Sequence, residues 1–314
     1  MPHPRRFRFG VLCRESPSGP ELIKQARQIE DLGYSTFFVP DHFIDAPLAP
    51  VPALAAVAVA TTTLRVGPLV LCNDYTHPAV VAHEMATIDL ISEGRLELGI
   101  GAGWMTADYE QTGIPMDRAG VRIERLAESV DVLKGLFADG PFSHSGKYYT
   151  ISEFDGRSAP VQRPHPPIII GGGGKKLLSL AGREADIVGV IANAARGYMD
   201  DPLEARSMVD EETDDKIAWV REAAGDRYPD LEIQTLCSYT HVAADTTTVA
   251  GQVASEVGVS VDELLRIPVV MIGSVSQIAE ELHARRERWD MSYFVVMADK
   301  AEEFAPVVAE LAGK

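Results

Sequence analysis

The sequence predicts an α/β fold, a single (β/α)8 TIM barrel with loop insertions at the face where the strands end. Two observations lead to this prediction. Short apolar runs rich in β-branched residues alternate along the 314 residues with segments whose apolar positions recur at helical spacing. No low-complexity linker or change of composition divides the chain, so residues 1–314 are expected to form one domain. Eight such units favour closure into a barrel over an open, doubly wound sheet.

The predicted strands are the short apolar runs. They cover residues 7–13, 35–39, 64–71, 95–100, 168–170, 185–191, 231–241 and 292–297. The three isoleucines at 168–170 do not alternate with polar residues, which is typical of a strand buried on both faces. Pro68 lies inside the third run and indicates an irregularity there, because proline cannot donate a hydrogen bond to a sheet.

The predicted helices follow these strands. They cover residues 21–32, 53–60, 77–92, 117–137, 178–184, 214–224, 246–266 in two pieces, 276–289 and 301–311. Residues 139–166 are expected to form an irregular insertion with a short hairpin at 146–151, and 193–215 an acidic excursion over the barrel mouth. Together with residues 14–20, these insertions are the segments expected to select the substrate.

The composition excludes several classes of protein. A net charge of −17 without a basic stripe argues against a nucleic-acid partner. No apolar run approaches the roughly 20 residues of a membrane helix, and no apolar signal segment opens the chain. Three widely spaced cysteines, Cys13, Cys72 and Cys237, indicate a reducing cytoplasm without disulfides, and no Cys/His spacing predicts a metal site.

The most informative stretch is the end of the fifth predicted strand. It consists of four consecutive glycines, Gly171, Gly172, Gly173 and Gly174. Glycines let the backbone approach a ligand, and the N–H groups that open the following helix suit an anion such as a phosphate. A dinucleotide fingerprint would need glycine at Lys176, and a P-loop would need serine or threonine after its lysine, so neither motif fits. The alternative is a tight turn between strand and helix.

Other candidates lie where strands end, because that face carries the active site of such barrels. His42 follows the second strand and can move a proton near neutral pH; its alternative role is to tie down a loop. Asp41 is expected to orient that loop or His42. Cys72 is interpreted as a small apolar residue at a strand end and not as a nucleophile, because it has no evident histidine partner.

Several segments, in their order and spacing, resemble a known family. They are residues 38–43 (FVPDHF), 88–104 (IDLISEGRLELGIGAGW), 167–174, 181–186 and 272–282. Over essentially the whole chain the sequence is similar to the bacterial-luciferase-like flavin and deazaflavin oxidoreductases, and more closely to the branch that uses coenzyme F420. This resemblance implies a (β/α)8 barrel, a cofactor ring held at the strand ends, a small-molecule substrate and a homodimer.

The resemblance also implies site residues. His42 matches a histidine beside the reacting carbon of the ring, and residues 71–73 match a bulge that often contains a non-prolyl cis peptide. The cofactor positions that match are Asp41, Leu71, Cys72, Asn73, Gly101, Ala102, Gly103, Gly171, Gly172, Gly173 and Gly174. The implied reaction is hydride transfer between F420 and a small organic substrate. The alternatives are an FMN-dependent monooxygenase and a non-catalytic ligand-binding barrel.

Three positions depart from the family's patterns. Trp104 stands where the sugar-phosphate dehydrogenases have a glutamate, and Ala107 replaces a polar residue common after the Gly-Trp element. Residues 193–195, after the sixth strand, contain no lysine set for a sugar phosphate. Trp104 and the missing lysine set argue against glucose 6-phosphate as the substrate, whereas Ala107 implies that one usual contact with the cofactor ring is absent.

Overall fold

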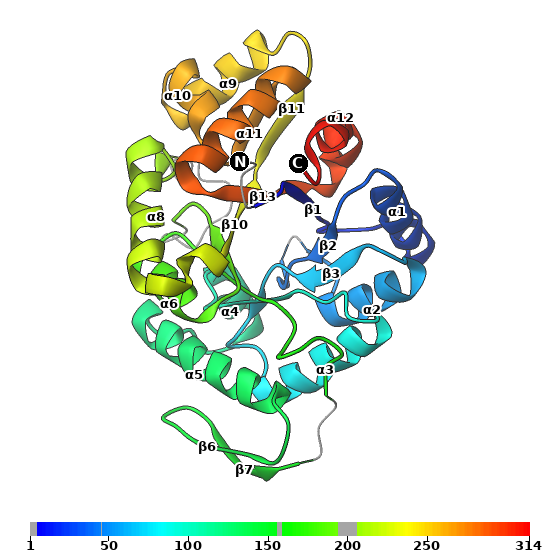
Figure 1. The fold of residues 1–314 in the computed structure, drawn as a ribbon, viewed down its shortest axis with the longest axis vertical. Coiled ribbons are helices and arrows are strands. Elements are labelled where there is room, and N and C mark those ends of the chain that lie inside the picture. The colour runs from blue at the N-terminus through cyan, green and yellow to red at the C-terminus, as the bar shows by residue number, and fades with distance from the viewer. Residues whose placement is uncertain (1–4, 45, 156–158, 194–205) are drawn as a thin grey trace.

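The centre of the molecule is a nearly closed parallel sheet surrounded by helices (Figure 1). The structure, a computed structural model, describes residues 5–44, 46–155, 159–193 and 206–314. Nine strands of these segments pair in the order β3-β2-β1-β13-β10-β9-β8-β5-β4. Val66 of β3 also bridges Leu96 just before β5, which brings the two ends of the sheet together. The predicted α/β barrel is confirmed.

The strands of this barrel coincide closely with the predicted apolar runs. They are β1 (Arg8–Leu12), β2 (Thr36–Val39), β3 (Arg65–Pro68), β4 (Leu71–Cys72), β5 (Leu98–Gly101), β8 (Ile168–Gly172), β9 (Ile187–Val190), β10 (Glu232–Cys237) and β13 (Met291–Met297). Successive side chains of a strand point to opposite faces, so Phe37 packs in the core under the helices and Phe38 in the barrel interior. The single predicted strand at 64–71 is interrupted, which gives β3 and β4.

Most of the described helices surround the sheet (Figure 1). In chain order, the described helices are α1 (Gly19–Asp31), α2 (Pro50–Ala60), α3 (Pro78–Ile91), α4 (Thr106–Thr112), α5 (Ala119–Phe137), α6 (Lys175–Glu184), α8 (Asp210–Ala224), α9 (Thr247–Val257), α10 (Val261–Arg266), α11 (Val275–Trp289) and α12 (Ala301–Leu311), with 3-10 turns η1 (Gly225–Asp230) and η2 (Ala298–Lys300). In α5 an apolar stripe at helical spacing, which includes Leu126, Val130 and Leu133, is buried.

Four elements differ from the sequence prediction. Residues 106–112, expected as a loop, form α4. The predicted strand 231–241 divides after Cys237, and β11 (Tyr239–Val242) leaves the barrel to pair in parallel with β12 (Val270–Gly273), a strand that was not predicted. Helix α8 begins at Asp210, four residues earlier than expected. Residues 194–205 of the predicted excursion lie outside the described residues.

The predicted insertion contains a hairpin of β6 (Phe142–Ser145) and β7 (Thr150–Phe154). Its turn is bound to α5, because the carboxylate of Glu128 accepts backbone N–H bonds from Lys147, Tyr148 and Tyr149. Figure 1 shows the hairpin projecting beyond the ring of helices. The expectation that residues 139–163 help to select the substrate stays a prediction.

A buried ionic cluster occupies the barrel at the starts of the strands. The carboxylate of Glu97 contacts the guanidinium of Arg8, accepts from Arg65 Nε at 2.7 Å and from the Tyr293 hydroxyl at 2.9 Å. Burial favours the neutral acid, but the two guanidinium groups outweigh it and hold the pKa of Glu97 below its ordinary value. This end of the barrel is filled, so a ligand site has to lie at the opposite end, where the strands finish.

Candidate active site

The His42 imidazole is held by a buried carboxylate from another element. Its Nδ1 lies 2.6 Å from Oδ2 of Asp108 on α4. The histidine side chain is 17% exposed and the Asp108 side chain is fully buried. An imidazole fixed through one nitrogen and open to solvent in part can address a substrate with the other nitrogen.

Asp108 is bonded on both carboxylate oxygens. Its Oδ1 accepts the backbone N–H groups of Phe43 at 3.0 Å and Ile44 at 3.1 Å. Its Oδ2 accepts from the Tyr75 hydroxyl at 3.3 Å in addition to the His42 contact. The carboxylate thus fixes both the imidazole and the two residues that follow it in the chain.

Aromatic rings line the surroundings of His42. Trp104 meets the imidazole edge-on, with ring centroids 5.4 Å apart and an interplanar angle of 82°. Phe43, whose side chain is 54% exposed, lies against Tyr75 with centroids 5.0 Å apart. Trp104, which stands where the sugar-phosphate dehydrogenases have a glutamate, therefore packs directly against His42.

Asp41 has a different partner from the one expected. Its Oδ2 accepts the backbone N–H of Cys72 at 3.0 Å, so it joins the end of β2 to β4. Burial raises the pKa of the Asp41 carboxyl, against the opposing effect of the Cys72 N–H bond. The expectation that Asp41 orients His42 is wrong, because Asp108 holds the imidazole; the expectation that it orients the loop is consistent with the Cys72 bond.

The strand irregularity predicted from Pro68 lies between β3 and β4. It contains a non-prolyl cis peptide at Leu69–Val70, two residues before the positions expected from the family. Beyond it, Leu71 pairs with Ile100 and Cys72 with Gly101. A Cβ added to Gly101 would lie 2.7 Å from Cγ2 of Val70, so this glycine lets β5 approach the irregularity closely.

Cys72 lies within a hydrogen-bonded chain that also involves α4. Its Sγ is 3.3 Å from the Tyr109 hydroxyl, which donates to Oδ2 of Asp74 at 3.0 Å. Burial raises the pKa of the Cys72 thiol to about 11. A thiol of this kind is a poor nucleophile at neutral pH, in agreement with the interpretation of Cys72 as a packing residue.

The Asn73 side chain contacts the turn of the hairpin. Its Nδ2 lies 3.2 Å from the Tyr149 hydroxyl, while its Oδ1 is buried without a partner among the described residues. The neighbouring carbonyl groups of Ala102 and Gly103 accept from the Arg122 guanidinium at 3.1 and 3.2 Å. Asn73, Ala102 and Gly103, which were expected to contact the cofactor ring, are therefore bonded to side chains of the hairpin turn and of α5.

The four glycines lie at the end of β8, which neighbours β5 in the sheet. The Gly172 carbonyl accepts the backbone N–H of Ile191 at 3.2 Å. A Cβ on Gly173 would lie 2.5 Å from the carbonyl oxygen of Ala192, whereas a Cβ on Gly174 would have no described atom within 4 Å. Gly174 is the N-cap of α6, and no described side chain caps this helix. The first N–H groups of α6 are thus available to an anion.

The predicted residues therefore form two groups on neighbouring strands. Asp41, Leu71, Cys72, Asn73 and Gly101 are linked directly, and the four glycines lie across β5 from them.

Sequence reasoning missed Asp108, Tyr75 and Tyr109. The one available signal was that residues 106–112 follow the end of the fourth predicted strand, and so return to the face that carries His42.

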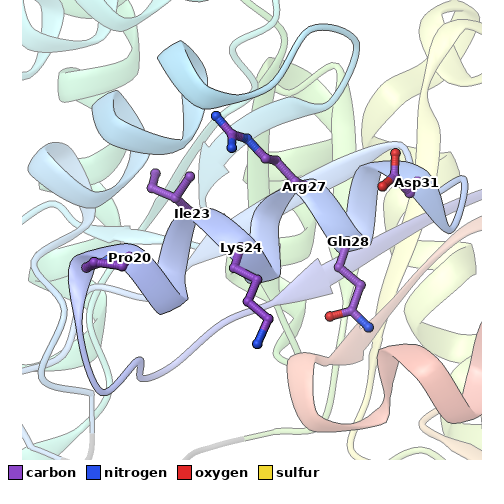
Figure 2. A pocket seen from close by; sticks show the side chains of 6 residues that line it. All are labelled: Pro20, Ile23, Lys24, Arg27, Gln28 and Asp31. Carbon is purple, nitrogen blue, oxygen red and sulfur yellow. The ribbon is translucent and has the colours of Figure 1, made fainter.

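Two further features bear on the class of site. Among the described residues, no cluster of three or more His, Cys, Asp or Glu side chains is arranged to hold a metal ion, and no helix could span a membrane. Figure 2 shows a depression on the exposed side of α1. It is lined by Pro20, Ile23, Lys24, Arg27, Gln28 and Asp31. It contains none of the residues predicted for the site.

This barrel, with a histidine and a run of four glycines at the ends of its strands, has the architecture of the luciferase-like enzymes. The family model described as "Luciferase-like monooxygenase" matches residues 7–248, which is more than half of the chain. The chain belongs to this family.

Members with different cofactors are similar to the chain. It is 32% identical over 189 residues to the F420-dependent glucose-6-phosphate dehydrogenase of Microbacterium testaceum, covering 57% of this chain and 55% of that protein. It is 30% identical over 142 residues to the FMNH2-dependent dimethylsulfone monooxygenase of Pseudomonas putida, covering 45% and 39%. The chain thus spans about half the length of the curated relatives it matches.

The fold extends over the whole chain in a solved structure. The coenzyme F420-dependent tetrahydromethanopterin reductase from Methanopyrus kandleri superposes with a TM-score of 0.76, covering 98% of both chains at 18% identity. At this identity the likeness establishes the fold alone. The family is thus one of flavin- and deazaflavin-using oxidoreductases on a common barrel.

Proposed function

We propose that the protein is an F420-dependent oxidoreductase that transfers a hydride between the deazaflavin and a small organic substrate. The observation that carries this proposal is the His42–Asp108 pair at the barrel mouth. A hydride transfer to or from a carbonyl or imine must be balanced by a proton, and a fixed imidazole is the side chain best suited to exchange one near neutral pH.

The residues present fit a cofactor with a flat ring and an anionic tail. The uncapped first turn of α6 and the open backbone at Gly171 and Gly174 suit the tail phosphate. The backbone of β4 and β5 would support the ring, with its position set by the Asp41–Cys72 bond. When bound, the deazaflavin supplies a ring carbon that accepts or donates a hydride and does not activate oxygen as a flavin does.

The protein's own part in the reaction is to orient, to exclude water and to move one proton. His42 Nε2 takes a proton from the substrate heteroatom when the substrate is oxidised and returns it when the substrate is reduced. Asp108 keeps the imidazole of His42 in place. Trp104 and Phe43 present apolar surface beside it. Trp104 also occupies the position of the sugar-phosphate dehydrogenases' glutamate, which supports a substrate other than glucose 6-phosphate.

The test is a cofactor titration. Purified protein is mixed with F420 or with FMN in oxidised and reduced forms, and binding is followed by fluorescence quenching. We expect micromolar or tighter binding of F420 and much weaker binding of both FMN forms. Tight FMN binding without F420 binding would overturn the proposal in favour of the alternative, an FMN-dependent monooxygenase, which the similarity to the dimethylsulfone monooxygenase supports.

We also propose that the protein works as a homodimer through the outer faces of α2 and α3. The exposed apolar side chains there are Val59, Val80, Leu90 and Ile91, from 38% to 75% exposed. Helix α2 contains no charged residue. Two copies with a net charge of −17 repel each other, so a face rich in exposed apolar side chains is where they can meet. Light scattering would give the mass of the particle in solution.

A further inference from the structure

We propose that Asp108 is a positioning residue that fixes the tautomer of His42, with hydrogen on Nδ1 and the lone pair on Nε2. The effect on turnover rests on the proposed function, but the tautomer itself is a property of the protein alone. Asp108 comes from α4, 66 residues away in the chain, and its side chain is fully buried.

The inference rests on the different partners of the two carboxylate oxygens of Asp108. Oδ1 accepts two backbone N–H groups, from Phe43 and Ile44, which can only donate. Oδ2 faces Nδ1 of His42 at 2.6 Å. A carboxylate only accepts hydrogen bonds, so a nitrogen at this distance must carry the hydrogen. In the neutral imidazole the other nitrogen, Nε2, then holds the lone pair and is the proton acceptor.

The same contacts make the orientation of the carboxylate rigid. Phe43 and Ile44 follow His42 directly, so one side chain anchors the loop and the imidazole together. Trp104 meets the imidazole edge-on and restricts its rotation from another side. The Nε2 lone pair is therefore presented in a defined direction before any substrate arrives, which reduces the cost of ordering the site.

This geometry predicts the result of an isosteric replacement. In Asp108→Asn the amide oxygen must stay with the Phe43 and Ile44 N–H groups, because the amide nitrogen cannot accept from them. The amide NH2 group then faces Nδ1, which has to become the acceptor. The variant therefore transfers the hydrogen to Nε2 and removes the lone pair from the side that faces the substrate.

The experiment is 15N NMR of histidine-labelled full-length protein without cofactor, from about pH 5 to about pH 9. The His42→Gln spectrum identifies the His42 signals among the eight histidines. We expect hydrogen on Nδ1 in the neutral form of the wild type and on Nε2 in Asp108→Asn. The matched control is Tyr75→Phe, which removes the other donor to Oδ2 and should leave the tautomer unchanged.

Hydrogen on Nε2 in the wild type, or an unchanged tautomer in a folded Asp108→Asn, would overturn the inference. Circular dichroism establishes that the variant is folded. With the identified cofactor, Asp108→Asn should lower kcat by about 10²- to 10⁴-fold with little change in KM. If neither cofactor supports turnover in the wild type, the proposed function fails while the NMR result still decides on Asp108.

Discussion

The His42 end and the glycine end of the candidate site differ in the kind of groups that form them. At the end near His42, long-range side-chain contacts set the geometry: Asp108 holds the imidazole and Asp41 holds the Cys72 backbone. At the other end, Gly171 to Gly174 and the first turn of α6 offer backbone groups, and no described side chain caps the helix. The His42 end has a side chain that can exchange a proton, whereas the glycine end has only backbone groups, which can bind an anion.

The difference has a general physical basis. An anionic tail needs several N–H donors at fixed positions, and a helix start supplies them from the backbone whatever its side chains are. Proton transfer needs one group in one protonation pattern, and only a specific side-chain partner provides that. The two ends should therefore respond to substitution in opposite ways, one in turnover and the other in affinity.

The largest expected effect is at the proton-carrying end. His42→Ala should lower turnover by about 10²- to 10⁴-fold, because the substrate heteroatom loses its proton donor and acceptor. Cofactor affinity should stay within about threefold, since the imidazole contributes little of the binding surface. Steady-state kinetics with a fluorescence titration measures both quantities. Unchanged turnover would remove His42 from the mechanism, and a large loss of affinity would erase the contrast between the ends.

A smaller effect is expected at the glycine loop. Gly173→Ala places a Cβ 2.5 Å from the backbone oxygen of Ala192, and relieving such a clash costs about 1–3 kcal/mol. We expect a lower melting temperature and a cofactor affinity reduced about tenfold, with kcat at saturation nearly unchanged. Gly251→Ala on α9 is the control, since its Cβ meets no described atom within 4 Å and it lies outside the glycine loop. Equal effects of the two changes would show that packing at this loop does not govern binding.

The smallest effect concerns Cys72, whose backbone is held by Asp41. With its pKa raised to about 11 by burial, roughly 0.1% of the thiol is ionised at pH 8. We expect slow labelling by iodoacetamide in the folded protein, which accelerates as pH rises towards 11 while the protein stays folded. Cys72→Ser should keep turnover within about threefold, because the thiol packs and does not attack. Rapid labelling at neutral pH together with lost turnover would contradict this.

Most of the fold could be predicted from the sequence, because apolar runs of the barrel strands are a local signal. The exceptions have physical reasons. Helix α4 (Thr106–Thr112) reads TADYEQT, which contains no apolar stripe, and its burial comes from contacts with distant loops. β12 is four residues long and directly precedes a helix, and β11 turns out of the barrel to pair with it, a partnership that no local pattern encodes.

The site could be predicted in part for the same reason. The glycine run is visible as composition, and His42 as a residue at a strand end. Asp108 is a single acidic residue in a polar segment, which in isolation resembles a solvated surface residue. Its role depends on a contact across 66 residues. The cis peptide was expected at residues 71–73 and lies at Leu69–Val70, because Pro68 marks an irregular strand without specifying the bond.

Helix α4 carries Asp108 and Tyr109 side by side, one directed to His42 and the other to Cys72 and Asp74. One short segment thus contacts both the imidazole of His42 and the Cys72–Asp74 segment that follows the strand irregularity. For protein engineering, residues 103–113 form a natural cassette. Exchange of residues 103–113 as one block between related barrels would transfer Asp108 and Tyr109 together. Exchange of single residues would separate side chains whose effects depend on each other.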